Sequence, residues 1–243
     1  MIVNPKLKIT AFVEPFRHWV IDDFLTKDDA DMLSDLFPDA DNNWYEYRNI
    51  FEKKRALDKI EFMPSAHALT LLYLNSAPWV YVLENITGIK GLIGDPAFRG
   101  GGLHQIYPGG KLDVHADFNF HQHLKLDRRL NMLLYLNKDW RPEWKGQLEL
   151  WPTDMSECRI KIEPIFNRCV IFETTDWAFH GHPENLDCPE GRTRKSMAWY
   201  YYTNGRPEHE KTPPHSTKFQ KRPGDDESGE IERLRELRNK GRL

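Results

Sequence analysis

The segment His115-Ala116-Asp117 places an imidazole and a carboxylate two residues apart. At the end of a predicted strand, positions i and i+2 point to one face, so both groups can converge on one ion. A second imidazole from a distant strand would complete a facial triad and leave three coordination positions open, as iron(II) needs for O₂ activation. Because a lone His-x-Asp often arises by chance, a surface strand histidine remains the alternative interpretation of His115.

Two later segments carry side chains that suit the same chemistry. His180 and His182 lie in the strand-end segment 177–182, and either could supply the second imidazole. Arg194 precedes a strongly β-forming run at 197–202, and a buried arginine there could pair bidentately with a dicarboxylate. Ser196 would share its face of the strand, and the Tyr135 hydroxyl could reach the same carboxylate.

The order of these motifs resembles the prolyl 4-hydroxylase type of 2-oxoglutarate/Fe(II) oxygenase, including the hypoxia-factor prolyl hydroxylases and their bacterial and phage relatives. The likeness covers residues 100–203 and keeps the order and similar spacing of the motifs. It consists of QIYPGG at 105–110, HxD at 115–117, YLNKDW at 135–140, GQLELWP at 146–152 and IEP at 162–164, followed by FNR at 166–168, His180 and Arg194.

The resemblance implies a double-stranded β-helix, or jelly roll, with iron at its open end. Carried over by position, His115, Asp117 and His180 become the iron ligands. Arg194 becomes the anchor of the distal carboxylate of 2-oxoglutarate. Tyr135 would bond the same carboxylate, Ser196 would add a hydrogen bond, and Tyr107 would line the cosubstrate pocket. The cofactors implied are Fe(II), 2-oxoglutarate and O₂, with ascorbate as an optional reductant.

The second histidine of the segment is a departure from the family pattern. The spacing from His182 to Arg194 would also fit, but aligning 162–164 and Phe172 selects His180. His182 is then expected near the pocket or facing the substrate. The insert at 183–193 is expected to shape substrate access.

The first 90 residues are expected to support the site rather than form it. A first strand is predicted at 17–25, followed by a helix that Thr26 caps and that ends at Pro38. Residues 39–62 are expected to be irregular or loosely paired strands, forming a flap. The pattern from 64 to 87 is helical, with Pro78 kinking or dividing it.

After Gly88 the chain turns to short apolar runs separated by Gly, Pro, Asn and Asp, which is typical of a sandwich or barrel. The predicted strands are 103–107, 111–115, 130–136, 147–151, 160–162, 169–172 and 196–203. The expected fold is mainly β with flanking α: a jelly roll buttressed by N-terminal helices. One domain is predicted, with support at 1–90, a catalytic core at 91–205 and a C-terminal extension at 206–243. Ile231, Leu234 and Leu237 predict a short amphipathic helix, expected to pack on the domain surface.

The amino-acid composition limits the binding partners and the location expected for the protein. With 34 basic and 37 acidic residues the formal charge is -3, which provides no global field for nucleic acid or an anionic membrane. No apolar run reaches the ~20 residues of a membrane span. Three scattered cysteines indicate a reducing compartment, so a cytoplasmic location is expected. Oligomeric state is left open.

The predicted activity is hydroxylation of an unactivated C–H bond, with release of succinate and CO₂. The substrate is either a prolyl residue of a protein or peptide, or a small molecule. A non-catalytic jelly-roll metal-binding or sensor module and a zinc hydrolase are the alternatives. His121 and His123 are expected in a solvated loop or at the pocket mouth. Asn119 and Asn131 are expected either to bond substrate or cosubstrate, or to be buried strand-capping amides.

Overall fold

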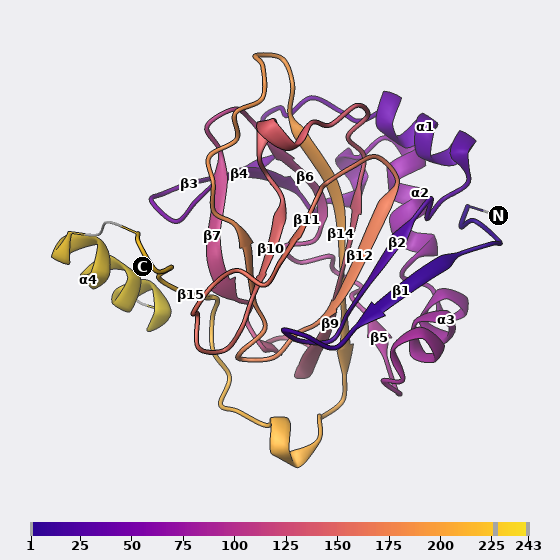
Figure 1. Ribbon diagram of the computed structural model, residues 1–243. Coiled ribbons are helices and arrows are strands. Elements are labelled where there is room, and N and C mark those ends of the chain that lie inside the picture. Colours follow the sequence, from indigo (N-terminus) through magenta and orange to yellow (C-terminus); the bar gives the residue numbers. More distant parts are fainter. Residues whose placement is uncertain (1, 226–227, 242–243) are drawn as a thin grey trace.

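A curled antiparallel sheet organises the chain, and the computed structural model describes it for residues 2–225 and 228–241. The main path of the sheet runs β1-β2-β12-β9-β14-β6-β4-β7-β13-β10-β11 (Figure 1). The expected mainly β jelly roll with flanking helices is confirmed. The strands are β1 (Lys8–Phe12), β2 (His18–Asp22), β3 (Tyr45–Arg48), β4 (Glu52–Leu57), β5 (Ile93–Gly94), β6 (Gly102–Ile106), β7 (Lys111–Ala116), β8 (Phe120–His121), β9 (Leu126–Tyr135), β10 (Leu148–Trp151), β11 (Ile160–Ile162), β12 (Arg168–Glu173), β13 (Phe179–His182), β14 (Arg194–Thr203) and β15 (Lys218–Phe219).

The helices lie outside the sheet, and three of them precede its core strands. They are α1 (Lys27–Asp35), α2 (Ser65–Tyr73), α3 (Ala77–Thr87) and α4 (Gly229–Asn239), with 3-10 turns at Ile60–Phe62, Pro142–Trp144 and Glu208–Glu210. Thr26 caps α1 as predicted, since its side chain accepts from the Asp29 amide. Among the described helices, none is long and apolar enough to cross a membrane.

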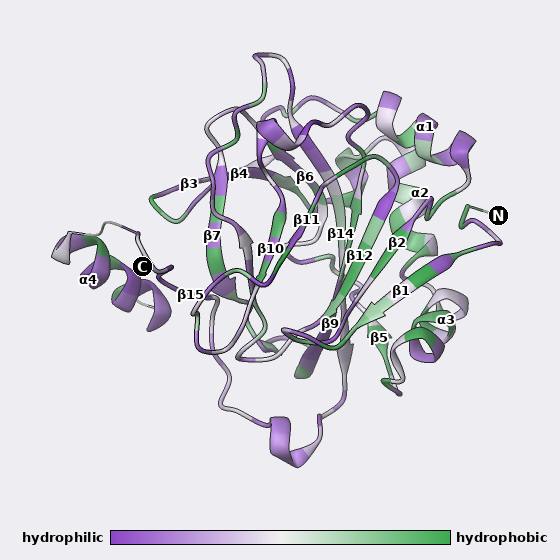
Figure 2. Ribbon diagram, in the orientation of Figure 1, coloured by the Kyte–Doolittle hydropathy of each residue, from purple (hydrophilic) through white to green (hydrophobic). Residues whose placement is uncertain are grey.

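Helices α2 and α3 pack against the strand that also carries Arg194. The indole of Trp199 in β14 donates to the Leu71 carbonyl at 3.1 Å, and the Tyr201 hydroxyl donates to that of Leu74 at 2.5 Å. Trp79 donates to the Tyr201 hydroxyl at 3.2 Å. These bonds satisfy polar groups within an otherwise apolar layer. In Figure 2 much of β10 and β12 is green and hydrophobic, whereas α4 is mostly purple and hydrophilic. The N-terminal helices therefore brace the back of β14.

Two sequence expectations need correction, and a third is confirmed in one of its two forms. Residues 39–62 contain a regular hairpin, β3–β4, and β4 also pairs with β6 and β7, so this segment belongs to the sheet. Of the two alternatives for Pro78, the structure shows the division: α2 ends at Tyr73, and α3 begins at Ala77 with Pro78 in its first turn, where no amide hydrogen is needed. The first strand spans only His18–Asp22, and β1 precedes it as its antiparallel partner.

Candidate active site

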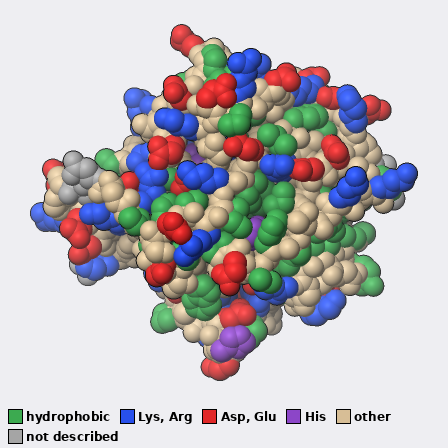
Figure 3. Space-filling view, in the orientation of Figure 1, with side chains coloured by type: hydrophobic (Ala, Val, Ile, Leu, Met, Phe, Trp, Pro, Cys, Tyr) green, Lys and Arg blue, Asp and Glu red, His purple; other side chains and the backbone are tan. Residues whose placement is uncertain are grey.

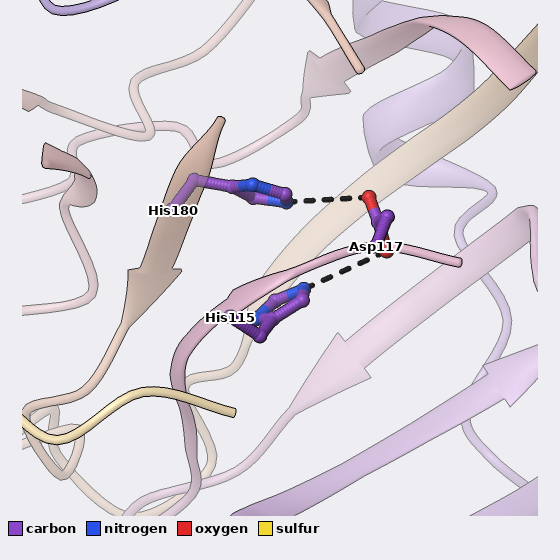
Figure 4. A group of neighbouring side chains, drawn as sticks. All are labelled: His115, Asp117 and His180. Atoms are coloured by element: carbon purple, nitrogen blue, oxygen red, sulfur yellow. Dashed lines mark ion pairs between the residues drawn. The ribbon is translucent and has the colours of Figure 1, made fainter. Parts of the chain in front are cut away.

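His115, Asp117 and His180 meet at one point of the sheet. Their nearest ligand atoms all lie within 4.8 Å of one another. The Nε2 atom of His115 is 3.7 Å from one Asp117 oxygen, and that of His180 is 3.4 Å from the other. Figure 4 shows both imidazoles directed at the carboxylate from two strands. The predicted triad is thus assembled in space, with ligand types suited to iron(II).

The pairing of β7 with β13 brings the two histidines together. His180 is the register partner of His115, and their ring centroids are 4.4 Å apart. Gly181 makes this approach possible. A Cβ atom there would stand 2.8 Å from the Leu112 carbonyl oxygen and 2.9 Å from that of Asp113. Any larger residue would push the two strands apart and separate the ligands.

Backbone carbonyls fix the tautomers of both histidines. The Nδ1 atom of His115 donates to the Asp113 carbonyl at 2.8 Å, and that of His180 donates to the Ala178 carbonyl at 2.9 Å. A carbonyl only accepts, so the proton resides on Nδ1 and each Nε2 presents a lone pair to the centre. Burial, together with the charge of His115, lowers the pKa of His180, which favours the neutral ligand form.

The Asp117 carboxylate is held by two donors from β9. Arg128 Nη2 donates to Asp117 Oδ2 at 3.0 Å, and Asn131 Nδ2 donates to the same oxygen at 2.7 Å. Burial opposes ionisation, but the charge of Arg128 and the neighbouring His115 and His180 outweigh it. The pKa of Asp117 therefore lies well below its usual range. The group is a carboxylate wherever the protein is folded near neutral pH.

Arg128 was not among the residues expected from the sequence. Its guanidinium is 1% exposed and lies 3.5 Å from the ring centroid of Tyr200 and 4.5 Å from that of Phe118. It also donates to Asn131 Oδ1 from Nε and Nη2. Asn131 thus bonds the carboxylate and its arginine, a role that neither sequence interpretation of this amide included. The sequence signal that could have identified this role was the presence of two polar residues, Arg128 and Asn131, within an otherwise apolar strand.

An inner cavity of about 80 Å³ opens beside the triad. Arg194 and Ser196 line it, and both are buried. Arg194 Nε donates to the Gly146 carbonyl at 2.8 Å, and Nη2 donates to the Tyr135 hydroxyl at 3.3 Å. Among the described residues, no carboxylate pairs with Arg194. A buried cation without a counter-ion is costly, so a carboxylate from a ligand fits this position.

Tyr135, Arg194 and Ser196 are therefore brought together as predicted, whereas Tyr107 is not. The inner cavity is lined from β6 by His104 and Ile106, which share one face of the strand. Tyr107 falls on the other side, where its hydroxyl donates to Gln105 Oε1 at 2.8 Å. The expectation that it lines the cosubstrate pocket is not supported by this geometry, because it is one strand position out of phase.

His182 belongs to the inner cavity rather than to the triad. It lines that cavity with Arg194, and burial, together with the Arg194 charge, places its pKa well below the usual value. The register shifts between His180 and His182, and only His180 belongs to the group of potential metal ligands. His104 and Lys54 also line the cavity, and neither was expected from the sequence.

An outer cleft of about 610 Å³ lies over the triad and shares His115, Asp117 and Tyr200 with the inner cavity. The β3–β4 hairpin and the C-terminal segment form its walls. Phe219 of β15 is the register partner of His115, and its ring lies 5.6 Å from the imidazole and 5.0 Å from the Phe51 ring. The C-terminal segment is therefore part of the site.

Known proteins share this fold and this domain. Residues 101–202 match the family model of the 2OG-Fe(II) oxygenase superfamily. These residues therefore form a domain of the 2OG-Fe(II) oxygenase type. The superfamily implies iron(II), 2-oxoglutarate and O₂. The triad fits the first, and the buried guanidinium of Arg194 fits the second. A comparison with curated proteins gives no match.

Solved structures of prolyl 4-hydroxylases share this fold. A Pseudomonas putida prolyl-4-hydroxylase is 18% identical, covering 76% of this chain and 92% of that chain, with a TM-score of 0.56. A Trichoplax adhaerens prolyl hydroxylase, in complex with a hypoxia inducible factor peptide fragment, is 16% identical over 76% and 83% of the two chains, with a TM-score of 0.55. A Phytophthora capsici prolyl 4-hydroxylase is 20% identical over 91% and 68%, with a TM-score of 0.53.

Proposed function

We propose that this oxygenase hydroxylates an unactivated C–H bond, either of a prolyl residue in a protein or peptide or of a small molecule. The observation that carries the proposal is the buried Arg194 beside a His-Asp-His triad, with no carboxylate counter-ion for it in the part of the chain that the structure describes. Zinc hydrolysis would use the triad but would give Arg194 no role, so the combination favours oxygenase chemistry.

Each residue has a defined task in this proposal. His115, Asp117 and His180 hold the metal. The hydrogen bonds that each Nδ1 donates to a backbone carbonyl, and the one that the carboxylate accepts from Asn131, keep them oriented. Arg194 and Tyr135, with Ser196, anchor the distal carboxylate of 2-oxoglutarate. Bound iron(II) with 2-oxoglutarate and O₂ supplies an oxidation that yields succinate, CO₂ and a hydroxylated product. Ascorbate would serve only to keep the iron reduced.

The outer cleft supports a substrate that lies across the triad. Its lining joins Tyr45 and Tyr47 of β3 with charged side chains of both signs, including Glu52 and Lys59. Such a cleft can hold an extended polar chain as well as a compact polar molecule. The shared fold with a hydroxylase that is bound to a peptide adds support for a peptidyl substrate. The free cysteines agree with a reducing, cytoplasmic location.

Succinate release tests the proposal. Purified protein should convert 2-oxoglutarate to succinate only when Fe(II) and O₂ are both supplied, slowly alone and faster with a true substrate. His115→Ala should abolish the reaction, while His123→Ala, in the loop after the triad, should not. Equal turnover after complete removal of metal would contradict the proposal. Screening prolyl peptides and metabolites for stimulation would then identify the substrate class.

A further inference from the structure

A second chamber of about 480 Å³ adjoins the outer cleft. It lies between the loop that follows Asp117 and the C-terminal segment. Four residues line both spaces, so the chamber and the cleft are continuous: Arg99, Phe118, Thr217 and Arg238. Phe118 also lies against Arg128, which bonds Asp117. A substrate held at the triad could therefore extend into this chamber.

The charge of the chamber lining has one sign. Arg99, Arg238 and Lys240 contribute cations, and no Asp or Glu is among the described residues that line the chamber. Among the described residues, no carboxylate pairs with Arg99. The nearest carboxylate to Arg238 is Glu52, at 3.8 Å. Figure 3 shows both signs interspersed over the face it displays, so a cationic lining is a local feature.

A buried imidazole N–H in the same lining lacks a partner. The Leu124 amide donates to Nδ1 of His121 at 3.1 Å, so Nδ1 is unprotonated and the proton resides on Nε2. His121 is 4% exposed, and its Nε2 has no hydrogen-bond partner in the described structure. A buried donor left unpaired costs free energy, and a ligand oxygen would remove that cost.

We infer that this chamber binds an anionic group of the substrate, a carboxylate or a phosphate, while the carbon to be hydroxylated lies at the triad. The inference rests on the proposed function and narrows its substrate class. Arg99 and Arg238 would supply charge-assisted hydrogen bonds, and His121 would supply a neutral donor. Phe118 and Phe120 would contact the apolar part that joins the two ends of the substrate.

Histidine NMR tests the chamber without relying on turnover. The protein is labelled with ¹⁵N in its imidazoles, and His121→Gln identifies the His121 signal. Zn(II) and saturating 2-oxoglutarate are present, so the triad and Arg194 are occupied. Inorganic phosphate and, separately, acetate are titrated at constant ionic strength. The His121 signal should move saturably with at least one anion, while that of His67, buried behind α1, should not. Phosphate alone would indicate a phosphate group, and acetate binding a carboxylate.

Matched variants decide whether the chamber is the site. Arg99→Gln combined with Arg238→Gln should lower the affinity for the anion at least tenfold, and Arg99→Gln alone should lower it less. Arg233→Gln removes the same charge from an exposed position of α4 and should change nothing. Unaltered binding in the double variant, or no saturable shift in the wild type, would overturn the inference. Calorimetry of 2-oxoglutarate binding separately reports on the proposed function, so the two failures can be distinguished.

Discussion

Arg128 contacts the Asp117 carboxylate at 3.0 Å from within the sheet, at a site where only 1% of the arginine is exposed. The pair is completed by Asn131, which donates to the carboxylate and accepts from the guanidinium. A buried arginine can be stable here because it is paired with Asp117, hydrogen-bonded to Asn131 and stacked on Tyr200. The orientation of one triad residue is therefore set by a network that lies outside the triad.

Removing that arginine should weaken metal binding. Arg128→Gln keeps a polar side chain but leaves Asp117 without its counter-charge and with one donor fewer. Loss of a group that orients a ligand typically lowers metal affinity by about 10–100-fold. Metal titration by calorimetry measures the effect. Arg129→Gln is the matched control, since Arg129 pairs with Glu210 at 3.2 Å instead. Equal losses in both variants would contradict a specific role for Arg128.

The two histidines of β13, His180 and His182, should have different functions. His180→Ala should lose the metal and the metal-dependent turnover together, because the Nε2 atom of His180 faces the Asp117 carboxylate. His182→Ala should retain the metal and instead change the 2-oxoglutarate requirement, because His182 lines the inner cavity beside Arg194. Metal content after gel filtration compares them. Loss of metal in His182→Ala with retention in His180→Ala would reverse the assignment.

Arg194 should govern the affinity for 2-oxoglutarate. Truncating one side of a buried ion pair costs about 3–5 kcal/mol, so Arg194→Ala should weaken binding roughly a hundredfold or more. Arg192→Ala should not, since Arg192 is at the surface near Trp144 and donates to the Lys138 carbonyl at 3.4 Å. Calorimetric titration with 2-oxoglutarate measures both variants. Similar affinities in wild type and Arg194→Ala would show that another cation binds the cosubstrate.

Asp176 should make stability depend on acid pH. Burial raises its pKa, but hydrogen bonds from His215 and Thr212 and the charges of His215 and Lys218 lower it to about 2. The unfolded value is about 3.9, so the folded pKa is depressed. The stabilisation is therefore present above about pH 4 and is lost as the pH falls toward 2.

Urea unfolding at pH 5 and pH 3 tests this dependence. The wild type should lose more free energy of unfolding between the two values than Asp176→Asn does. Asp187→Asn, at an exposed carboxyl, should retain the wild-type dependence. Identical pH dependence in wild type and Asp176→Asn would show that the contact with His215 contributes nothing.

Local sequence patterns predicted those features that depend only on residues close together in the sequence. His115 and Asp117 could be paired because i and i+2 share a strand face, and Thr26 could be placed because helix capping is local. Arg128 was not predicted, because its contact with Asp117 depends on where β9 lies relative to the end of β7 in the folded chain. Tyr107 was misplaced because a shift of one residue reverses the face of a strand. Sequence spacing alone did not determine that phase.

The C-terminal segment shows the same limit more clearly. An amphipathic helix was predicted near Leu234, and α4 is present. Its position was not predictable, because the helix is fixed by a long-range contact. Asn239 accepts from the Phe219 amide at 2.8 Å and donates to its carbonyl at 3.0 Å. Phe219 in turn pairs with His115. No local pattern around residues 218–219 indicates a partner 104 positions earlier.

The pairing of Phe219 with His115 also bears on biosynthesis. Synthesis proceeds from the N-terminus, so β7 and β13 leave the ribosome before the segment that completes the cleft wall. If β7 and β13 pair during that interval, His115 and His180 come together while the cleft is still open on the side that Phe219 later covers. A chain that stalls before residue 219 would expose a metal-binding oxidation centre to solvent without the wall that confines its substrate. Translation order thus makes the two triad histidines available before the selectivity of the site is established.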